Sequence, residues 1–347
     1  MDHLRICAEH EVGSGALSTG LDDYRLVHRA LPELNLDQVA LDIKFLGKLL
    51  RAPLLISAIT GGAPQARQIN LNLAEAAQAL GLAMGVGSQR AAIEDPSLEA
   101  TYQVREVAPD ALLFANLGAV QLNYGYGVQE CRRAVEMIGA DALVLHLNPL
   151  QEALQPNGNT RFAHLLDRIA AVCQHLEVPT IVKEVGWGIC ESVVRQLAQV
   201  GVAAVDVAGA GGTSWSEVEK YRARTDLQQR VAEHFVDWGI PTAEAIIQAR
   251  RAAPDLGVIG SGGIRTGPQA AVALALGADL VGLAGPLVVP ATVSAQAVED
   301  ELTVVIEGLR VAMYAAGLPD IAALKEARLS HLRSAKPHRP RSVCDDV

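Results

Sequence analysis

Eight short apolar runs recur along this 347-residue chain and constrain its fold more than any other feature. The runs are Leu54–Ala58, Leu82–Val86, Leu112–Ala115, Ala142–Leu145, Thr180–Val182, Ala203–Val207, Val258–Gly260 and Leu280–Leu283. Between most of them lie amphipathic, alanine-rich segments of helical length, such as 69–80 and 191–200. Strands that alternate with helices form parallel βαβ units, and eight of these favour an α/β TIM barrel over an open doubly wound sheet.

The segments outside this rhythm predict the domain organisation. Residues 1–50 are poorly periodic and predict an N-terminal extension that packs on the barrel, which itself spans residues 51–318. Residues 319–347 predict a C-terminal segment, and its end from Ser330 onward is expected to be disordered because it is rich in Pro, Arg and His.

The longest gap between apolar runs extends from Gly209 to Leu256. We interpret it as an insertion after the sixth strand that covers part of the barrel mouth. It contains three helical patterns, at 217–224, 227–235 and 242–253.

Charge and cysteine usage exclude several classes of protein. The net charge of −10 argues against nonspecific nucleic-acid binding. The five cysteines form no C-x-x-C pair, so a disulfide framework or a zinc site is not expected. The start at Met1 does not read as a signal peptide, and no apolar stretch of about 18 residues could span a membrane. These features predict a cytoplasmic protein that does not associate with membranes.

A cluster of polar residues follows the fourth apolar run. His146 and Asn148 point to the same side because successive strand residues alternate. Gln151 and Glu152 follow on a loop opened by Pro149. A polar strand terminus meeting water explains any one of these residues, but four such groups at one strand end indicate an active-site edge.

Glycine-rich or polar segments follow the other strands as well. Gly262-Gly263 after the seventh strand and Ala284-Gly285 after the eighth fall where TIM barrels often bind phosphate. Glycines let backbone N–H groups approach a phosphate closely, although tight turns alone also require them. Together with Thr213, the pattern favours phosphate binding.

Charged residues at the strand ends leave several roles open. Lys183 can form a Schiff base, offset a developing negative charge or pair with Glu184. Glu152 is a candidate general base or Mg²⁺ ligand. Arg90 and Arg265 are candidate anion clamps, with an ordinary surface arginine as the alternative.

Six motifs, taken together, resemble the type 2 isopentenyl-diphosphate isomerase family over roughly residues 3 to 318. They are Thr60-Gly61-Gly62, Gly87-Ser88-Gln89-Arg90, His146-x-Asn148-x-x-Gln151-Glu152, Lys183-Glu184-Val185-Gly186, Ala210-Gly211-Gly212-Thr213-Ser214-Trp215 and Ser261-Gly262-Gly263-Ile264-Arg265. The resemblance implies an FMN-dependent TIM-barrel isomerase that interconverts isopentenyl and dimethylallyl diphosphate in isoprenoid biosynthesis. It also implies reduced FMN, NADPH as the reductant, Mg²⁺, and a homo-oligomer, tetrameric or octameric.

The resemblance implies roles for individual residues. The residues that would hold FMN are Ala58, Ile59, Thr60, Ser88, Asn116, Lys183 and Thr213. Those around its phosphate would be Gly262, Gly263, Arg265, Ala284 and Gly285. Substrate would be bound by His3, Ser88, Gln89, Arg90 and Gln151. The residues of the reacting centre would be Gln151, His146, Asn148 and Lys183, with Glu152 on Mg²⁺.

Two positions depart from the family pattern. Ile59 replaces the usual Met before Thr-Gly-Gly, a change whose volume is tolerable. The family also has a diphosphate-binding Arg-Lys pair shortly before an Asp-His or Glu-His, whereas this chain starts at Met1-Asp2-His3. Arg5 lies on the other side of that histidine and cannot simply replace the pair. Either the start codon is placed too late, which we favour, or this chain binds its substrate weakly.

Three alternatives to the isomerase follow from the same residues. The first is an FMN-binding protein that has lost both its Arg-Lys clamp and its catalytic activity. The intact motif from His146 to Glu152 argues against it, because FMN binding alone would not need these residues. IMP dehydrogenase or GMP reductase would need a cysteine in the loop after the sixth strand, and none occurs between Cys190 and Cys344. A 2-hydroxy-acid oxidase would want a His–Arg pair near the seventh strand, but no histidine lies between His234 and His331.

Overall fold

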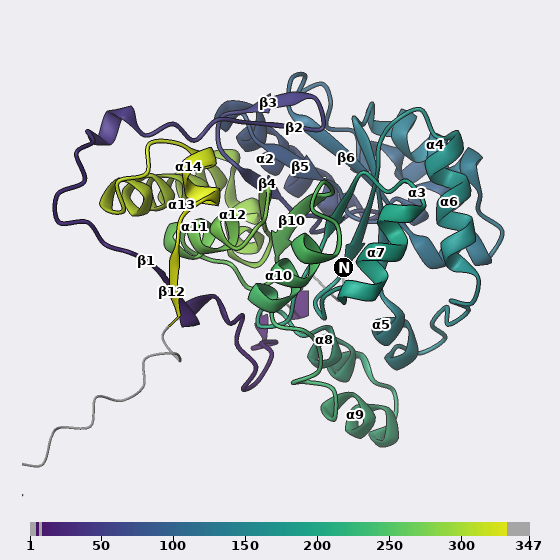
Figure 1. Cartoon of the computed structure of the whole chain (residues 1–347). Helices are drawn as coiled ribbons and strands as arrows, with labels where there is room; N and C mark the ends of the chain where they lie inside the picture. The colour runs from purple at the N-terminus through teal and green to yellow at the C-terminus, as the bar shows by residue number, and fades with distance from the viewer. Residues whose placement is uncertain (1–4, 7–8, 332–347) are drawn as a thin grey trace, which may run out of the picture.

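A closed barrel of eight parallel strands forms the centre of the computed structural model, which describes residues 5–6 and 9–331 (Figure 1). Its strands are β4 (Leu54–Ile56), β5 (Ala83–Gly85), β6 (Leu112–Gly118), β7 (Ala142–Leu147), β8 (Thr180–Glu184), β9 (Ala204–Asp206), β10 (Gly257–Ser261) and β11 (Leu280–Leu283). Each coincides with one of the eight predicted runs, and the barrel closes by pairing of β11 with β4. The TIM-barrel prediction is confirmed.

The barrel is accompanied by helices, most of which surround it (Figure 1). They are α2 (Pro64–Leu80), α3 (Arg90–Glu94), α4 (Val128–Ile138), α5 (Pro149–Leu154), α6 (Leu165–His175), α7 (Glu191–Gln199), α8 (Trp215–Arg222), α9 (Asp226–Glu233), α10 (Thr242–Ala252), α11 (Gly267–Ala275), α12 (Val288–Val293), α13 (Ala295–Ala315) and α14 (Ile321–Lys325). In α2, Pro64 supplies a preset φ at the first turn and Gly81 ends the helix with φ 65°. The buried face of α2 combines alanines such as Ala74 and Ala77 with the larger Ile69 and Leu73, and it joins the hydrophobic core around the barrel.

A hairpin plugs the end of the barrel at which the strands begin. β2 (Ile43–Phe45) and β3 (Lys48–Leu50) pair antiparallel, and Phe45 and Leu50 join the side chains that fill the barrel interior. Lys48 Nζ lies 2.8 Å from Asp141 Oδ1, just before β7. Because this end is filled with apolar side chains, polar chemistry is left to the opposite end, where the strands finish.

Residues 12–14 reach that opposite end. Ser14 N–H donates to Gly212 O over 3.1 Å, and Ser214 N–H donates to Val12 O over 2.7 Å. The chain then forms β1 (Tyr24–Leu26), which pairs antiparallel with β12 (Leu329–His331). Ser330 and His331 are therefore in a strand rather than in a disordered tail. The remaining tail, 332–347, and His3 lie outside the described residues.

The segment after β9 is only partly an insertion. α8 and α9 pack on each other and on α5, standing apart from the barrel at the bottom of Figure 1. α10, the third of the expected helices, packs instead on α7 and β10 and is the barrel's own sixth helix. In the part of the chain that the structure describes, we find no helix with the length and apolar character needed to cross a membrane.

Candidate active site at the barrel mouth

Three polar side chains form a row across neighbouring strands at the barrel mouth. The sheet register pairs His146 of β7 with Lys183 of β8, and Lys183 with Asp206 of β9. Residues paired in register point to the same side of a sheet, so these three side chains are neighbours. Asn116 of β6 extends the row, because its Oδ1 lies 2.8 Å from His146 Nδ1.

His146 is held as a neutral imidazole. A carboxamide oxygen can only accept, so the contact with Asn116 Oδ1 requires a proton on His146 Nδ1. Burial first, and then the nearby Lys183 ammonium, lower the pKa of His146 to about 4. At neutral pH the ring therefore carries no charge, and its orientation is fixed by Asn116.

This low pKa predicts a pH-dependent stability. The pKa of His146 is about 4 in the folded state, against 6.5 for an unperturbed histidine, so protons bind preferentially to the unfolded chain. Its contribution is complete above pH 6.5 and is lost as the pH falls toward 4, by up to roughly 3 kcal/mol. Urea denaturation of the wild type and of His146→Gln at several pH values should show a shallower acid decline in the variant. Parallel declines would contradict this, and exposed His175→Gln is the control.

A chain of hydrogen bonds links the polar residues that follow β7. α5 begins with Pro149 and places Gln151 and Glu152 in its first turn, both buried. Asn148 Nδ2 donates to Gln151 Oε1 over 3.2 Å and to Glu152 Oε1 over 3.1 Å. No described residue donates to Asn148 Oδ1, although that atom is buried. A buried acceptor without a partner points to a ligand or water at this place.

Glu219 belongs to the same network, and sequence reasoning missed it. Gln151 Nε2 donates to Glu219 Oε1 over 3.0 Å, and Arg222 lies 2.7 Å from Glu219 Oε2. The Glu219 side chain is 0% exposed although it comes from the polar insertion helix α8. A glutamate is rarely buried unless it is paired, but no spacing in the sequence connects position 219 with position 151.

Lys183 and Glu184 do not form a salt bridge with each other. Lys183 Nζ donates to the backbone carbonyl of Glu184 over 2.6 Å. The Glu184 carboxylate instead accepts three backbone N–H groups in the loop after β8. Burial raises the pKa of Glu184 to about 7. The structure thus corrects the ion pair considered from the sequence, because alternate strand residues face opposite sides.

The glycine-rich loops after β9 and β10 are pressed together. Gly211, Gly262 and Gly263 have φ values of 114°, 107° and 70°, which favour glycine. A Cβ on Gly263 would lie 2.6 Å from Gly211 O, so no larger residue fits. Thr213 follows directly. At Gly285, by contrast, a Cβ would meet nothing within 4 Å, which leaves open space beside this backbone.

The loops after β4 and β5 also lie against each other. Gly87 N–H donates to Thr60 O over 3.2 Å, and Tyr102 Oη donates to Ser88 O over 2.6 Å. A Cβ on Gly61 would lie 2.0 Å from a Tyr102 ring carbon, so glycine is required here. Ala58, Ile59, Thr60 and Ser88 are partly exposed, as residues that line an open mouth would be.

Gln89 does not line the mouth. It is 0% exposed, its Nε2 donates to Ala134 O over 2.8 Å, and its Oε1 accepts from Asn116 N over 2.9 Å. The expected contact of Gln89 with substrate is wrong for this structure, where Gln89 anchors the backbone of β6. Arg90 is partly exposed and pairs with Glu94 at 2.8 Å. Arg265 and Gly285 are exposed, and Ala284 is partly exposed.

Glu152 is surrounded by hydrogen-bond donors. Besides Asn148, its carboxylate accepts from Gln155 Nε2 and from the backbone N–H of Asn159. Among the described residues no group of three or more His, Cys, Asp or Glu side chains could hold a metal. A cation at Glu152 would therefore take its other ligands from amide oxygens, water or a bound anion, as Mg²⁺ commonly does.

Comparison with known proteins decides the family. The model for FMN-dependent dehydrogenases matches residues 129–331. The isopentenyl-diphosphate delta-isomerase of a Synechocystis strain is 52% identical over 97% of this chain and 97% of its own length. That of Rickettsia bellii is 47% identical over 95% of this chain and 97% of its own. The chain belongs to the isopentenyl-diphosphate delta-isomerase family.

Solved structures of more distant proteins share the fold of this isomerase-family chain. A mandelate oxidase mutant with a C4a-OH-FMN adduct superposes with a TM-score of 0.69 over 95% of each chain, at 19% identity. Another mandelate oxidase mutant, with benzaldehyde, gives 0.68 over 95% and 94% at 19% identity. At such low identity the likeness extends to the barrel architecture alone.

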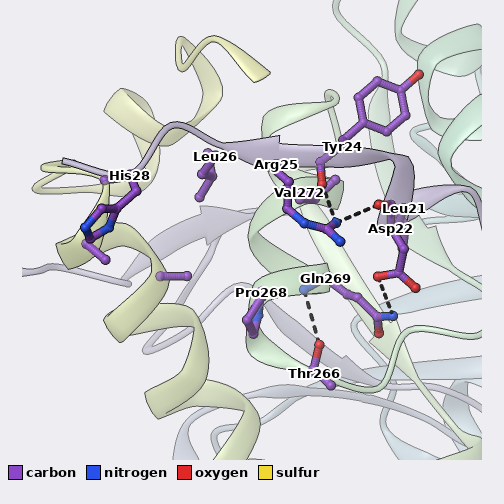
Figure 2. A pocket seen from close by; sticks show the side chains of 13 residues that line it. Leu21, Asp22, Tyr24, Arg25, Leu26, His28, Thr266, Pro268, Gln269 and Val272 are labelled. Atoms are coloured by element: carbon purple, nitrogen blue, oxygen red, sulfur yellow. Dashed lines mark hydrogen bonds between the residues drawn. The ribbon is translucent and has the colours of Figure 1, made fainter. Parts of the chain in front are cut away.

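A cavity of about 350 Å³ lies under β1 and beside the start of α11, where Gln269 Oε1 accepts from Arg265 N (Figure 2). Arg25 Nη1 donates there to Asp22 O over 2.7 Å and to Tyr24 O over 2.8 Å. Gln269 Nε2 donates to Asp22 Oδ1 over 3.4 Å. These polar groups form hydrogen bonds with one another, and the rest of the lining is largely apolar. The candidate site is therefore defined by the polar residues of the mouth and not by this cavity.

Proposed function

We propose that this chain interconverts isopentenyl diphosphate and dimethylallyl diphosphate at an FMN bound in the barrel mouth. The observation that carries the proposal is the network from Asn148 through Gln151 to Glu219, which follows β7, the strand that pairs with the strand of Lys183. The names of relatives about half identical over nearly the whole chain support it. The reaction adds one proton at the terminal methylene carbon and removes another from C2, so it needs proton transfer without net oxidation.

The residues of the mouth fit a flavin nucleotide. The glycines with positive φ after β9 and β10 leave backbone uncovered by side chains next to Thr213. Gly285 borders open space that could accommodate a phosphate. We assign Thr60, Ser88, Asn116, Lys183 and Thr213 to FMN, with Gly262, Gly263, Arg265, Ala284 and Gly285 around its phosphate. Reduced FMN, when bound, would supply and accept the proton at N5.

The residues of the chain would hold and orient the substrate. Lys183 Nζ, a cation at the mouth, would offset negative charge on the reduced ring. Gln151 is held by Glu219 on one side and by Asn148 on the other, which fixes the direction of its amide. We assign the reacting centre to Gln151, His146, Asn148 and Lys183, because these side chains converge on one edge of the barrel. Gln151 and Asn148 are buried, so their side chains would also help to exclude water from the reacting centre.

The diphosphate and its cation belong on the Glu152 side of the mouth. Mg²⁺ prefers oxygen ligands, and both the Glu152 carboxylate and the unpartnered Asn148 Oδ1 provide them. Ser88 and Arg90 are assigned to the diphosphate, and Arg90 would exchange its bond to Glu94 for one to phosphate. His3 remains part of the proposal from the family resemblance.

The proposal extends to the reductant, the cell compartment and assembly. NADPH would reduce the FMN, and the protein would act in the cytoplasm as a tetramer or octamer. Exposed valines on two neighbouring helices support self-association, because several exposed apolar side chains on one part of a surface often mark a protein–protein interface. These valines are Val289, Val293, Val304 and Val311 of α12 and α13. The net charge of −10 argues against a nucleic-acid partner.

The test is anaerobic incubation of the purified chain with isopentenyl diphosphate, FMN, NADPH and Mg²⁺, with each component omitted in turn. We expect dimethylallyl diphosphate only in the complete mixture. Retention of FMN without any conversion of substrate would contradict the proposal and favour a flavoprotein that has lost catalysis.

A further inference from the structure

We propose that Glu184 is a positioning residue for the cofactor site, which holds Lys183 and the backbone of Thr213 in place through the loop that follows β8. This inference rests on the proposed binding of FMN at the mouth. It concerns a residue that does not itself face the mouth, since alternation along β8 turns its side chain away from that of Lys183.

The Glu184 carboxylate organises the loop directly. Its Oε2 accepts the backbone N–H groups of Val185, Gly186 and Trp187 over 2.7, 2.7 and 2.6 Å. Three successive N–H groups that converge on one oxygen fix the direction of the chain as it leaves the strand. With a pKa of about 7, Glu184 carries its full charge only above neutral pH. There an ionised acceptor binds the three N–H groups more strongly than a neutral one would, so the loop depends on the charge as well as on the shape of the side chain.

The main chain of the same residue holds Lys183. The ammonium donates to the Glu184 carbonyl over 2.6 Å, and that carbonyl belongs to the peptide unit whose N–H the carboxylate binds. Movement of this peptide would therefore move the anchor of the ammonium. The Glu184 side chain thus controls where the cation of Lys183 lies without touching a ligand.

The loop also connects to the phosphate side of the mouth. A Cβ on Gly186 would lie 3.1 Å from Thr213 O, so the two backbones are in close approach. Gly188 N–H donates to Ala208 O over 3.0 Å, and Ile240 N–H donates to Trp187 O over 2.8 Å. Through these contacts the loop after β8 supports the loop after β9, which carries the glycines at the proposed phosphate site.

Burial of Glu184 argues for a specific role. Only 7% of the residue is exposed, and removing a carboxylate from water is costly unless hydrogen bonds compensate. A glutamine of the same size would avoid that cost, yet it would weaken all three bonds to the loop. The charge therefore contributes to the geometry of the loop more than to the stability of the fold.

The test compares Glu184→Gln with Glu177→Gln. Glu177 is a matched control, because it precedes the same strand at its other end and its side chain is 68% exposed. For E184Q we expect a roughly tenfold weaker affinity for FMN. We also expect a more negative midpoint potential of the bound FMN, because a displaced Lys183 ammonium stabilises the reduced anion less. E177Q should match the wild type in both measurements.

A double-mutant cycle with Lys183→Ala separates positioning from general destabilisation. If Glu184 acts through Lys183, the potential of K183A should shift in the same direction, and adding E184Q should shift it little further. Thermal denaturation of each variant checks folding. If E184Q does not fold, Glu184→Asp, which keeps the charge on a shorter arm, should show the same shift at smaller size.

Two outcomes would overturn the inference and are distinguishable from failure of the proposed function. If the wild type binds FMN and E184Q has the same affinity and potential, the positioning role is wrong and the proposed function stands. Additive shifts in the double mutant would likewise exclude action through Lys183. If the wild type does not bind FMN, the proposed function itself is wrong and this inference falls with it.

Discussion

Replacing Glu152 with glutamine is expected to lower the turnover of isopentenyl diphosphate by about a hundredfold to a thousandfold. The carboxylate is buried and lies 3.1 Å from Asn148 Nδ2, beside the unpartnered Asn148 Oδ1. Glutamine keeps the shape but removes the negative charge that would bind Mg²⁺. The measurement is the rate of dimethylallyl diphosphate formation as a function of Mg²⁺ concentration, and the variant should need far more Mg²⁺.

Gln155→Ala provides the control for that experiment. It removes a hydrogen bond to the same carboxylate over 2.6 Å but leaves the charge in place. We expect a smaller loss, of about tenfold, because a hydrogen bond to the carboxylate is lost while the charge that would hold the cation remains. If E152Q retained the wild-type rate at the wild-type Mg²⁺ requirement, Glu152 would not be the cation ligand.

Replacing Lys183 with alanine is expected to lower turnover by at least about a hundredfold. Its ammonium is the cation in the row His146, Lys183 and Asp206 across the mouth. Without it, negative charge on a reduced flavin would lose the cation proposed to offset it, and Asp206 would lose the cation that is its neighbour in the row. Stopped-flow reduction by NADPH and steady-state isomerisation should both slow in the variant.

Lys44→Ala is the control for Lys183, because Lys44 is exposed on the hairpin at the opposite end of the barrel. It should leave both rates unchanged. Equal losses in the two variants would indicate a general charge effect. A K183A enzyme with the wild-type rate would remove Lys183 from the reacting centre.

The barrel could be predicted from the sequence because its signal is local. Each of the eight strands is a short apolar run buried on both faces, and the positions of strands such as β7 and β8 follow from those runs alone. The sequence also predicts that the side chains of His146 and Lys183 face the mouth. Side chains alternate along a strand, so the position of the strand decides which of them point inward.

The partners of those residues could not be predicted, because they come from distant segments. Glu219 lies 68 positions from Gln151, on a helix whose polar composition is typical of a solvent-exposed surface. Gln89 stands in a motif that suggests a ligand, but its amide binds the backbone of Asn116 and of Ala134. Only the fold brings these groups together.

The same limit applies to the boundaries of the larger segments. Residues 12–19 have no periodicity that would place them against the loop after β9, where Ser14 Oγ donates to Gly212 O over 3.0 Å. The sequence pattern of α10 does not distinguish a barrel helix from a helix of an insertion. Its packing on α7 and β10 shows that it is a barrel helix. Periodicity identifies an element, and tertiary contacts decide its place.

The most direct test of the account is the ratio of product formed to NADPH consumed under anaerobic conditions. An isomerase uses NADPH only to bring its flavin to the reduced state, so we predict many molecules of dimethylallyl diphosphate for each NADPH oxidised. Consumption of one NADPH for each isopentenyl diphosphate lost, with a product two hydrogens richer than the substrate, would show net reduction and would contradict the proposed proton-transfer reaction.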